Sequence, residues 1–111
     1  DAKENAKINN VENAEFFVGD VEKTLPKFIE KNKVSADVIF VDPPRKGCDK
    51  VALDTIMKLA PQKIVYISCN PATLARDLKF LEERYNIEKI AICDMFPWTS
   101  HVECVTVLYL K

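Results

Sequence analysis

Glycine is scarce in this chain of 111 residues, where only Gly19 and Gly47 are present. The sequence therefore contains no glycine-rich loop, the element that lets a backbone approach a bound cofactor closely. A charge excess is also missing, because 16 Lys and Arg residues stand against 17 Asp and Glu residues and leave a net charge of -1. Such a balance does not indicate a nucleic acid or an anionic membrane as a partner.

Long apolar runs and targeting signals are missing too. The longest runs, such as Ile64 to Ile67 and Val105 to Leu110, are far shorter than the roughly 20 residues that a membrane span requires. The first residues, DAKEN, contain neither an initiator methionine nor a secretory signal. We therefore expect a piece of a longer protein that has no contact with a membrane.

The cysteine pattern excludes the common metal sites. The four cysteines, at positions 48, 69, 93 and 104, form no Cys-x-x-Cys pair, and the chain has one histidine. A zinc site or an iron–sulfur cluster needs a denser set of ligands. We expect free thiols in a reducing cytoplasm.

The sequence does contain the material of one folded domain, with 48% hydrophobic residues. Short apolar runs predict strands at residues 14–18, 36–41, 63–68, 87–94 and 104–110. Amphipathic spacing predicts helices at residues 3–10, 21–33, 49–59 and 72–85. Asn70-Pro71 suits the start of the last helix, with Asn as its N-cap and Pro at its first position.

Alternation of strands and helices predicts an α/β fold. The sheet is expected to be mostly parallel with helices on both faces, and its last strand antiparallel, because residues 95–103 provide no crossover helix. In such sheets the chemistry gathers at the carboxyl ends of the strands. Polar or reactive groups follow the predicted strands at Gly19-Asp20, Asp42, Cys69-Asn70 and Asp94.

Asp42-Pro43-Pro44-Arg45 places a carboxylate at a strand end, in a loop that two prolines make rigid and poor in N–H donors. This loop suits the close approach of a planar ligand. The alternative is a turn that merely ends a strand.

Cys69 lies between a strand end and a helix start, where the helix dipole favours a thiolate. We interpret it as a nucleophile, whereas the other three cysteines are expected to be small buried hydrophobes. Further along, His101-Val102-Glu103 leads into the last strand, and alternation sends His101 and Glu103 to the same face. Either side chain could act as a base.

Three segments, DPPRKG, YISCNPATLARDL and DMFPWTSHVE, resemble in this order the signature segments of the RNA 5-methyluridine methyltransferases, which act on transfer or ribosomal RNA. The resemblance runs over residues 1–111. It implies that the chain is the carboxyl-terminal part of a single methyltransferase domain. The implied fold is Rossmann-like and partial, without its first strands and its glycine-rich loop.

The resemblance also implies roles for individual residues. Cys69 matches the nucleophile of the family and Glu103 its base. Asp20 and Asp42 match positions that contact the cofactor, S-adenosyl-L-methionine. Contacts to the substrate uridine are expected from five residues: Arg45, Asn70, Pro71, Phe96 and His101.

The chemistry explains these residue types. A thiolate that adds to C6 of uracil makes C5 nucleophilic enough to take a methyl group, and a base must then remove the C5 proton before the thiol can leave. The target base must lie outside any stack. Phe96, Trp98 and Tyr66 are therefore candidate stacking surfaces, with packing in the core as the alternative.

The missing elements limit what the 111 residues can do alone. We expect an incomplete sheet whose exposed edge is prone to pair with a second copy as a homodimer. We expect neither tight cofactor binding nor turnover, and RNA binding would rely on the longer protein.

Three other interpretations compete with this one. The Asp-Pro-Pro loop could belong to an amino-group methyltransferase, although Arg45 stands where such enzymes carry an aromatic residue. Cys69, His101 and Glu103 could form a cysteine hydrolase, which would leave the DPPR loop without a role. A non-catalytic RNA-docking or scaffold fragment would leave Cys69 and Glu103 unexplained.

Overall fold

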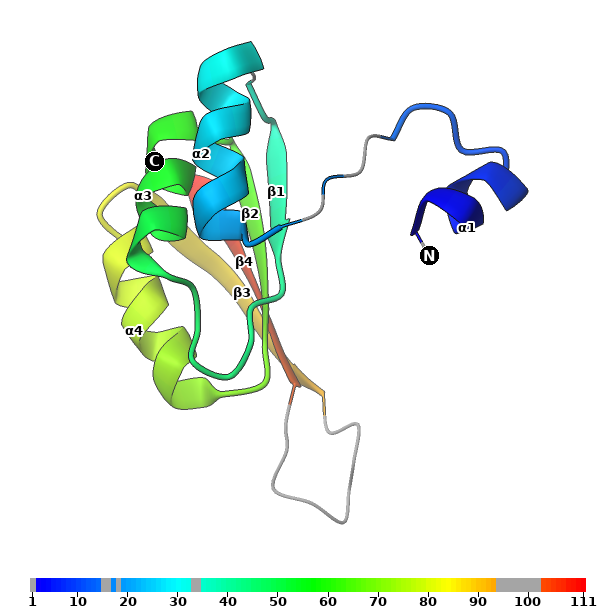
Figure 1. Ribbon diagram of the computed structural model, residues 1–111. Coiled ribbons are helices and arrows are strands. Elements are labelled where there is room, and N and C mark those ends of the chain that lie inside the picture. Colours follow the sequence, from blue (N-terminus) through cyan, green and yellow to red (C-terminus); the bar gives the residue numbers. More distant parts are fainter. Residues whose placement is uncertain (1, 15–16, 18, 33–34, 94–102) are drawn as a thin grey trace.

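The fold is a four-stranded sheet with a layer of helices. The computed structural model describes residues 2–14, 17, 19–32, 35–93 and 103–111. The strands are β1 (Val38–Val41), β2 (Lys63–Ser68), β3 (Tyr85–Cys93) and β4 (Glu103–Leu110). Figure 1 shows α2 (Val21–Asn32), α3 (Lys50–Leu59) and α4 (Pro71–Leu81) together on one side of the sheet, and α1 (Ala2–Ile8) apart from it.

The strand order is β1-β2-β4-β3, so the last strand in sequence is inserted between two earlier ones. β1 and β2 are parallel, whereas β4 is antiparallel to both β2 and β3. The α/β fold with an antiparallel last strand is therefore confirmed. Residues 94–102 alone separate β3 from β4, fewer than the dozen or so that a crossover between parallel strands needs, and the two strands pair antiparallel.

One face of the sheet, which we call the covered face, carries the core. Successive residues of a strand point to opposite faces, and the even-numbered residues 64–68 of β2 and 104–108 of β4 are accordingly buried on this face. On the other face of β2, Val65 is buried as well. The buried hydrophobic cluster joins both layers and consists of Leu53, Ile56, Ile64, Tyr66, Leu74, Leu78, Leu81, Tyr85, Cys104 and Leu108. Helices α3 and α4 supply its outer half.

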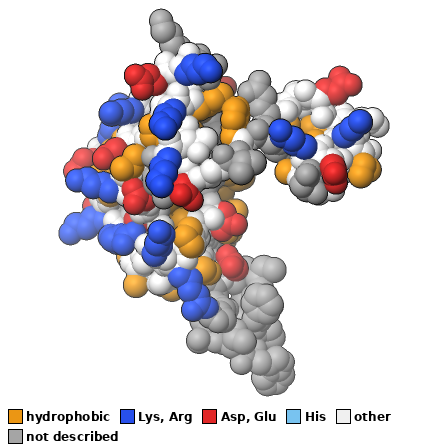
Figure 2. Space-filling view, in the orientation of Figure 1, with side chains coloured by type: hydrophobic (Ala, Val, Ile, Leu, Met, Phe, Trp, Pro, Cys, Tyr) orange, Lys and Arg blue, Asp and Glu red, His pale blue; other side chains and the backbone are white. Residues whose placement is uncertain are grey.

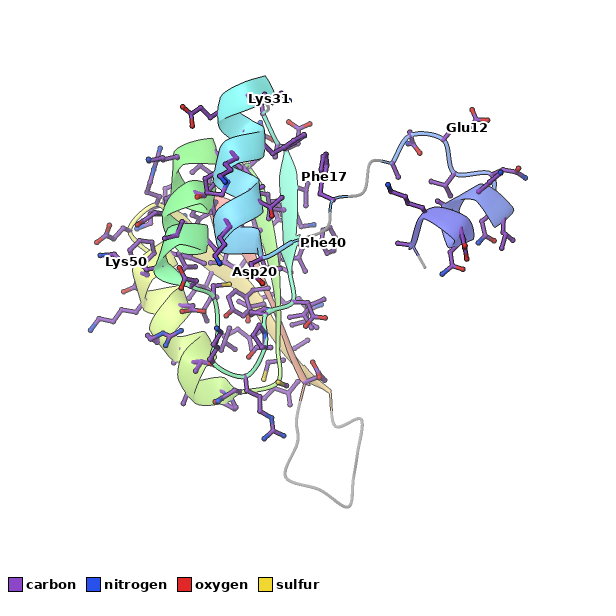
Figure 3. The ribbon with its side chains drawn as sticks, in the orientation of Figure 1. Glu12, Phe17, Asp20, Lys31, Phe40 and Lys50 are labelled. Carbon is purple, nitrogen blue, oxygen red and sulfur yellow. The ribbon has the colours of Figure 1, made fainter. Side chains whose placement is uncertain are left out.

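The opposite face, which we call the open face, has no helix over it among the described residues. On β1, Val38 is 45% exposed and Phe40 is 70% exposed, while Ile39 and Val41 pack against the core. Figure 3 shows Phe40 on the side of β1 away from the helices. We expected helices on both faces of the sheet. In the described part of the chain they cover one face.

The boundaries of the elements differ from the sequence prediction mainly after α4. The helix ends at Leu81, four residues before its predicted end at residue 85, and a turn leads into β3, which begins at Tyr85. Tyr85 is 1% exposed and its hydroxyl donates to the carbonyl of Pro61 at 2.6 Å. This long-range contact fixes Tyr85 in the sheet. The predicted strand at 14–18 lies largely outside the described residues.

The helix ends follow the capping rules. The side chain of Asp49 accepts from the amide of Val51, and the C-cap of α3, Ala60, has the left-handed conformation, with φ 46°.

Charged side chains gather on the helical side of the molecule (Figure 2). In the part of the chain that the structure describes, no helix has the length and apolar character needed to cross a membrane.

Candidate functional site

The candidate site lies at the edge of the sheet where β1 and β2 end and β4 begins. Asp42 directly follows β1 and Cys69 directly follows β2. Glu103 is the first residue of the antiparallel strand β4, so it lies at the same edge. The topology therefore brings together three of the residues predicted from sequence.

The β2–β4 ladder ends directly beside Cys69 and Glu103. The last pair of the β2–β4 ladder joins Ser68 to Cys104. Cys69 and Glu103 are the next residue beyond this pair on their respective strands. The thiol and the carboxylate are therefore both next to the last paired position of this ladder.

Strand alternation places Glu103 on the open face of the sheet. Glu103 follows the alternation of Val105 and Val107, which belong to the open face. Asp42 and Cys69 lie just beyond β1 and β2, so strand alternation sets the direction of Glu103 alone among the three.

Local hydrogen bonds fix the backbone around Cys69. The hydroxyl of Ser68, which is 3% exposed, accepts from the amide of Asn70 at 3.0 Å and donates to its carbonyl at 3.0 Å. The side chain of Asn70 accepts from the amide of Ala72 at 3.0 Å, which confirms Asn70 as the N-cap of α4. Pro71 is the first residue of the helix. The free thiol of Cys69 is half-buried.

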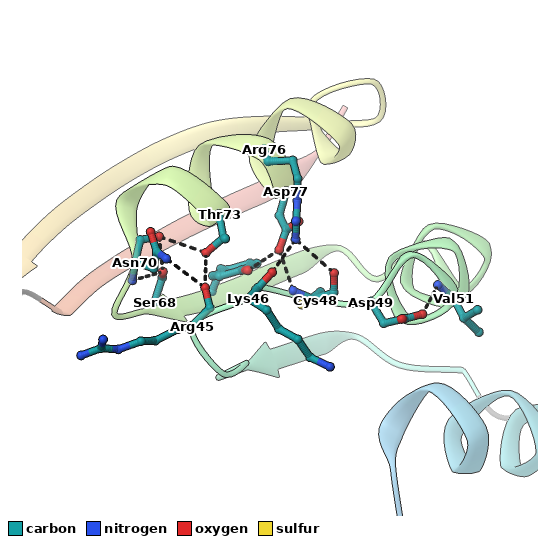
Figure 4. Close-up of polar contacts among 11 residues, drawn as sticks. Arg45, Lys46, Cys48, Asp49, Val51, Ser68, Asn70, Thr73, Arg76 and Asp77 are labelled. Carbon is teal, nitrogen blue, oxygen red and sulfur yellow. Dashed lines mark hydrogen bonds and ion pairs between the residues drawn. The ribbon is translucent and has the colours of Figure 1, made fainter.

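The loop from Asp42 to Cys48 is held against α4. Asn70 donates its side-chain N–H to the carbonyl of Arg45 at 3.1 Å, and the hydroxyl of Thr73 donates to the same carbonyl at 2.8 Å. In Figure 4 the guanidinium of Arg45 points away from α4. The loop backbone is thus fixed while the Arg45 side chain extends from it.

Asp42 and Asp20 are exposed carboxylates at this edge. Among the described residues, Asp42 forms no ion pair or side-chain hydrogen bond. Asp20 lies at the amino end of α2 (Figure 3) and forms one exposed ion pair, 3.9 Å long, with Lys23. Both carboxylates are accessible to hydrogen-bond donors of a ligand.

A buried polar network behind the loop was not foreseen from the sequence. Asp77, on α4, is 0% exposed, and its carboxylate accepts from the hydroxyl of Tyr66 and from the amide of Cys48, the latter at 2.8 Å. Burial, followed by the hydrogen bond to Asp77, raises the pKa of Tyr66. Burial also raises the pKa of the Cys48 thiol. The signal in the sequence is an aspartate at helical spacing from Leu74 and Leu81, on the apolar side of α4.

Some predicted residues are not brought to the site. Tyr66 is fully buried in the core, so it is not a stacking surface for a base, and the core alternative is correct for it. Asp94, Phe96, Trp98 and His101 lie outside the described residues.

A hollow in the described surface lies away from this site. It is an open groove of about 710 Å³ between residues 46–50 and α4, and Lys50, Lys79 and Phe80 contribute to its lining. Cys69, Glu103 and Asp42 do not line it. A ligand in this groove would lie on the helical side of the sheet.

The chain is similar in sequence to several RNA methyltransferases. Uncharacterized RNA methyltransferases of Halalkalibacterium halodurans and of Bacillus cereus (strain ATCC 14579) are 54% and 56% identical to the chain over 112 and 111 residues. These alignments cover 100% and 99% of the chain but 24% of either relative, so the chain spans about a quarter of their length.

A solved structure matches over most of the chain. The crystal structure of Pyrococcus abyssi tRNA (uracil-54, C5)-methyltransferase in complex with S-adenosyl-L-homocysteine has a TM-score of 0.77 and 42% identity. The match covers 96% of this chain and 25% of that one. The family model of the tRNA (uracil-5-)-methyltransferases matches residues 3–111. The chain therefore belongs to the tRNA (uracil-5-)-methyltransferase family.

Proposed function

We propose that the chain is the carboxyl-terminal part of a single catalytic domain that methylates C5 of a uridine in RNA. The observation that carries the proposal is the position of Cys69 and Glu103, one residue beyond the last pair of the β2–β4 ladder on either strand. A nucleophile and a base are then available at one uracil ring. Family membership and the likeness to the Pyrococcus enzyme support the same reaction.

In the proposed mechanism the Cys69 thiolate adds to C6 of uracil, and the electron pair of the C5–C6 double bond becomes available at C5. The cofactor supplies an electrophilic methyl group when it is bound. After C5 has gained the methyl group, Glu103 removes the C5 proton, the double bond re-forms and the Cys69 thiolate leaves. The enzyme is thereby returned to its starting state, apart from the proton on Glu103.

The residues present fit part of a site for S-adenosyl-L-methionine. Asp42 and Asp20 offer exposed carboxylates that can accept hydrogen bonds from hydroxyl or amino groups. The 111 residues contain no glycine-rich loop. We therefore propose that turnover needs further protein beyond these residues, and that Arg45, Asn70 and Pro71 border the uridine.

The proposal can be tested in a chimera in which residues 1–111 replace the matching segment of the Bacillus cereus relative. With S-adenosylmethionine and transfer or ribosomal RNA, nucleoside analysis should detect 5-methyluridine. Cys69→Ala should abolish the product. Cys104→Ala, which removes a buried thiol from β4, is the matched control and should retain it. Methylation of an exocyclic amine, or product from Cys69→Ala, would contradict the proposal.

The open face and the unpaired edge of β1 suggest that the isolated chain associates with a second copy. Among the described residues β1 is paired along one edge only, with β2, and Phe40 within β1 is 70% exposed. Unpaired strand edges with apolar neighbours promote pairing with other chains. We propose that the chain alone forms a homodimer through this edge.

A further inference from the structure

The inference concerns Asp77, a charged residue inside the core. It lies on α4 between the buried residues Leu74 and Leu81, and it is itself 0% exposed. A buried carboxylate is unfavourable unless charged or polar partners surround it. An apolar residue at this position would avoid the free-energy cost of burying a carboxylate. The contacts that Asp77 makes therefore indicate its role.

Both carboxylate oxygens of Asp77 accept hydrogen bonds. Its Oδ2 accepts from the amide of Cys48 at 2.8 Å and from the hydroxyl of Tyr66. Its Oδ1 accepts from Nε and Nη2 of Arg76, both at 3.1 Å. Arg76 Nη2 also donates to the carbonyl of Lys46 at 2.8 Å. The pair formed by Asp77 and Arg76 therefore binds the backbone of the loop between β1 and α3 on two sides (Figure 4).

Gly47 shows how closely the loop approaches this pair. A Cβ atom at this position would lie 2.6 Å from Arg76 Nη2 and 2.8 Å from Asp77 Oδ2. Its φ of 81° is in the left-handed region, which favours glycine. The loop backbone thus rests directly on the two charged groups.

The candidate nucleophile directly precedes the N-cap of the same helix. Cys69 precedes the N-cap of α4, and Asn70 and Thr73 hold the carbonyl of Arg45. The loop that begins with Asp42 is thus attached to the first turn of α4 at one point and to Asp77 at another. Movement of the loop relative to Cys69 is restricted at both.

We propose that Asp77 is a positioning residue that holds the Asp42–Cys48 loop in register with Cys69. The role rests on the proposed function, in which the loop contacts the cofactor and Cys69 attacks the uracil. Asp77 touches neither reactant. It acts through the loop backbone, and a displaced loop would move the methyl donor away from the activated carbon.

The test uses the same chimera with Asp77→Asn, which keeps the shape of the side chain but turns one acceptor into a donor. The KM for S-adenosylmethionine should rise, kcat should fall, and kcat/KM should drop about 10- to 100-fold, the range expected for a slightly misplaced reactant. A substitution that only unfolds part of the sample lowers the rate and leaves KM unchanged. KM is therefore the decisive readout.

Leu78→Ala is the matched control, because Leu78 is the next residue of α4, is 8% exposed and belongs to the hydrophobic cluster. It should lower the melting temperature and leave KM within about twofold of the starting value. Gly47→Ala, which disturbs the same approach from the side of the loop, should raise KM as Asp77→Asn does. The double substitution should cost less than the product of the two single effects.

An unchanged KM in Asp77→Asn, or an equal rise in Leu78→Ala, would overturn the positioning role while the proposed function stands. Absence of 5-methyluridine from the unsubstituted chimera would overturn the proposed function and this role with it.

Discussion

The two faces of the sheet differ in what they contribute. Ile64 and Leu108 on the covered face are 0% exposed, whereas Phe40 on the open face is 70% exposed. The predicted site residue Glu103 follows the open-face series of β4. Among the described residues, helices therefore cover one face of the sheet, and the other face, with the predicted site beside it, has no helical layer. Stability should depend on the covered face and function on the edge of the open one.

The largest effect is expected at the edge of the open face. Glu103→Gln in the chimera should slow formation of 5-methyluridine about 10²- to 10⁴-fold, because the C5 proton then lacks its base. The covalent adduct between protein and RNA should accumulate, and denaturing electrophoresis would reveal it as a slower band. The melting temperature should stay close to that of the unsubstituted chimera. A normal rate would remove Glu103 from the mechanism.

A large loss of stability is expected on the covered face. Leu108→Ala should lower the free energy of unfolding of the 111-residue chain by about 2–5 kcal/mol, because it opens a cavity in a fully buried position. Val107→Ala, at the neighbouring and half-buried position on the open face, is the control and should cost clearly less. Urea unfolding followed by circular dichroism measures both. Equal losses would contradict the difference between the faces.

Association of the isolated chain should depend on the open face. Phe40→Lys should shift the chain toward monomer at a given concentration, because it places a charge beside the unpaired edge of β1. Val51→Lys changes an exposed apolar residue of α3, which is 46% exposed, and should leave association unchanged. Sedimentation velocity over a range of concentrations separates the two. A monomeric unsubstituted chain at all concentrations would refute the homodimer.

The smallest effect concerns alkaline pH. Burial raises the pKa of Tyr66 in the folded chain, so the unfolded chain loses this proton first, and stability should decline as the pH rises above about 10. Tyr66→Phe should cost about 1 kcal/mol at neutral pH through the lost hydrogen bond, and its decline above pH about 10 should be shallower. Tyr109→Phe, at an exposed ring, is the control. Parallel curves for Tyr66→Phe and the unsubstituted chain would contradict this.

Much of the architecture could be predicted because it depends on local patterns. Short stretches of sequence encode the apolar runs of β1 and β2 and the apolar spacing of α3. The same holds for the helix start at Asn70-Pro71. The antiparallel last strand followed from the absence of a crossover helix. The placement of Asp42 and Cys69 followed from the general position of chemistry at the carboxyl ends of strands, whereas Glu103 was predicted from the resemblance.

Features that depend on distant contacts could not be predicted. Residues 82–84 are acceptable in a helix, but Tyr85 pairs with Leu110 in the sheet and donates its hydroxyl to Pro61, and α4 ends before them. Tyr66 belongs to the core because residues of α3 and α4 pack in the same cluster, and its hydroxyl donates to Asp77, eleven residues later. The roles assigned to Cys69, Glu103, Asp42 and Asp20 remain predictions, since geometry places these residues but does not show their chemistry.

The central claim is that Cys69 forms a covalent bond to C6 of the target uracil. The most direct measurement incubates the chimera with cofactor and RNA that contains 5-fluorouridine, and then maps any adduct that survives denaturation. Because a base cannot remove fluorine from C5, the adduct should persist on the peptide that contains Cys69 and should be absent from Cys69→Ala. Methyl transfer to RNA without such an adduct would contradict the claim and would favour direct transfer to an amino group.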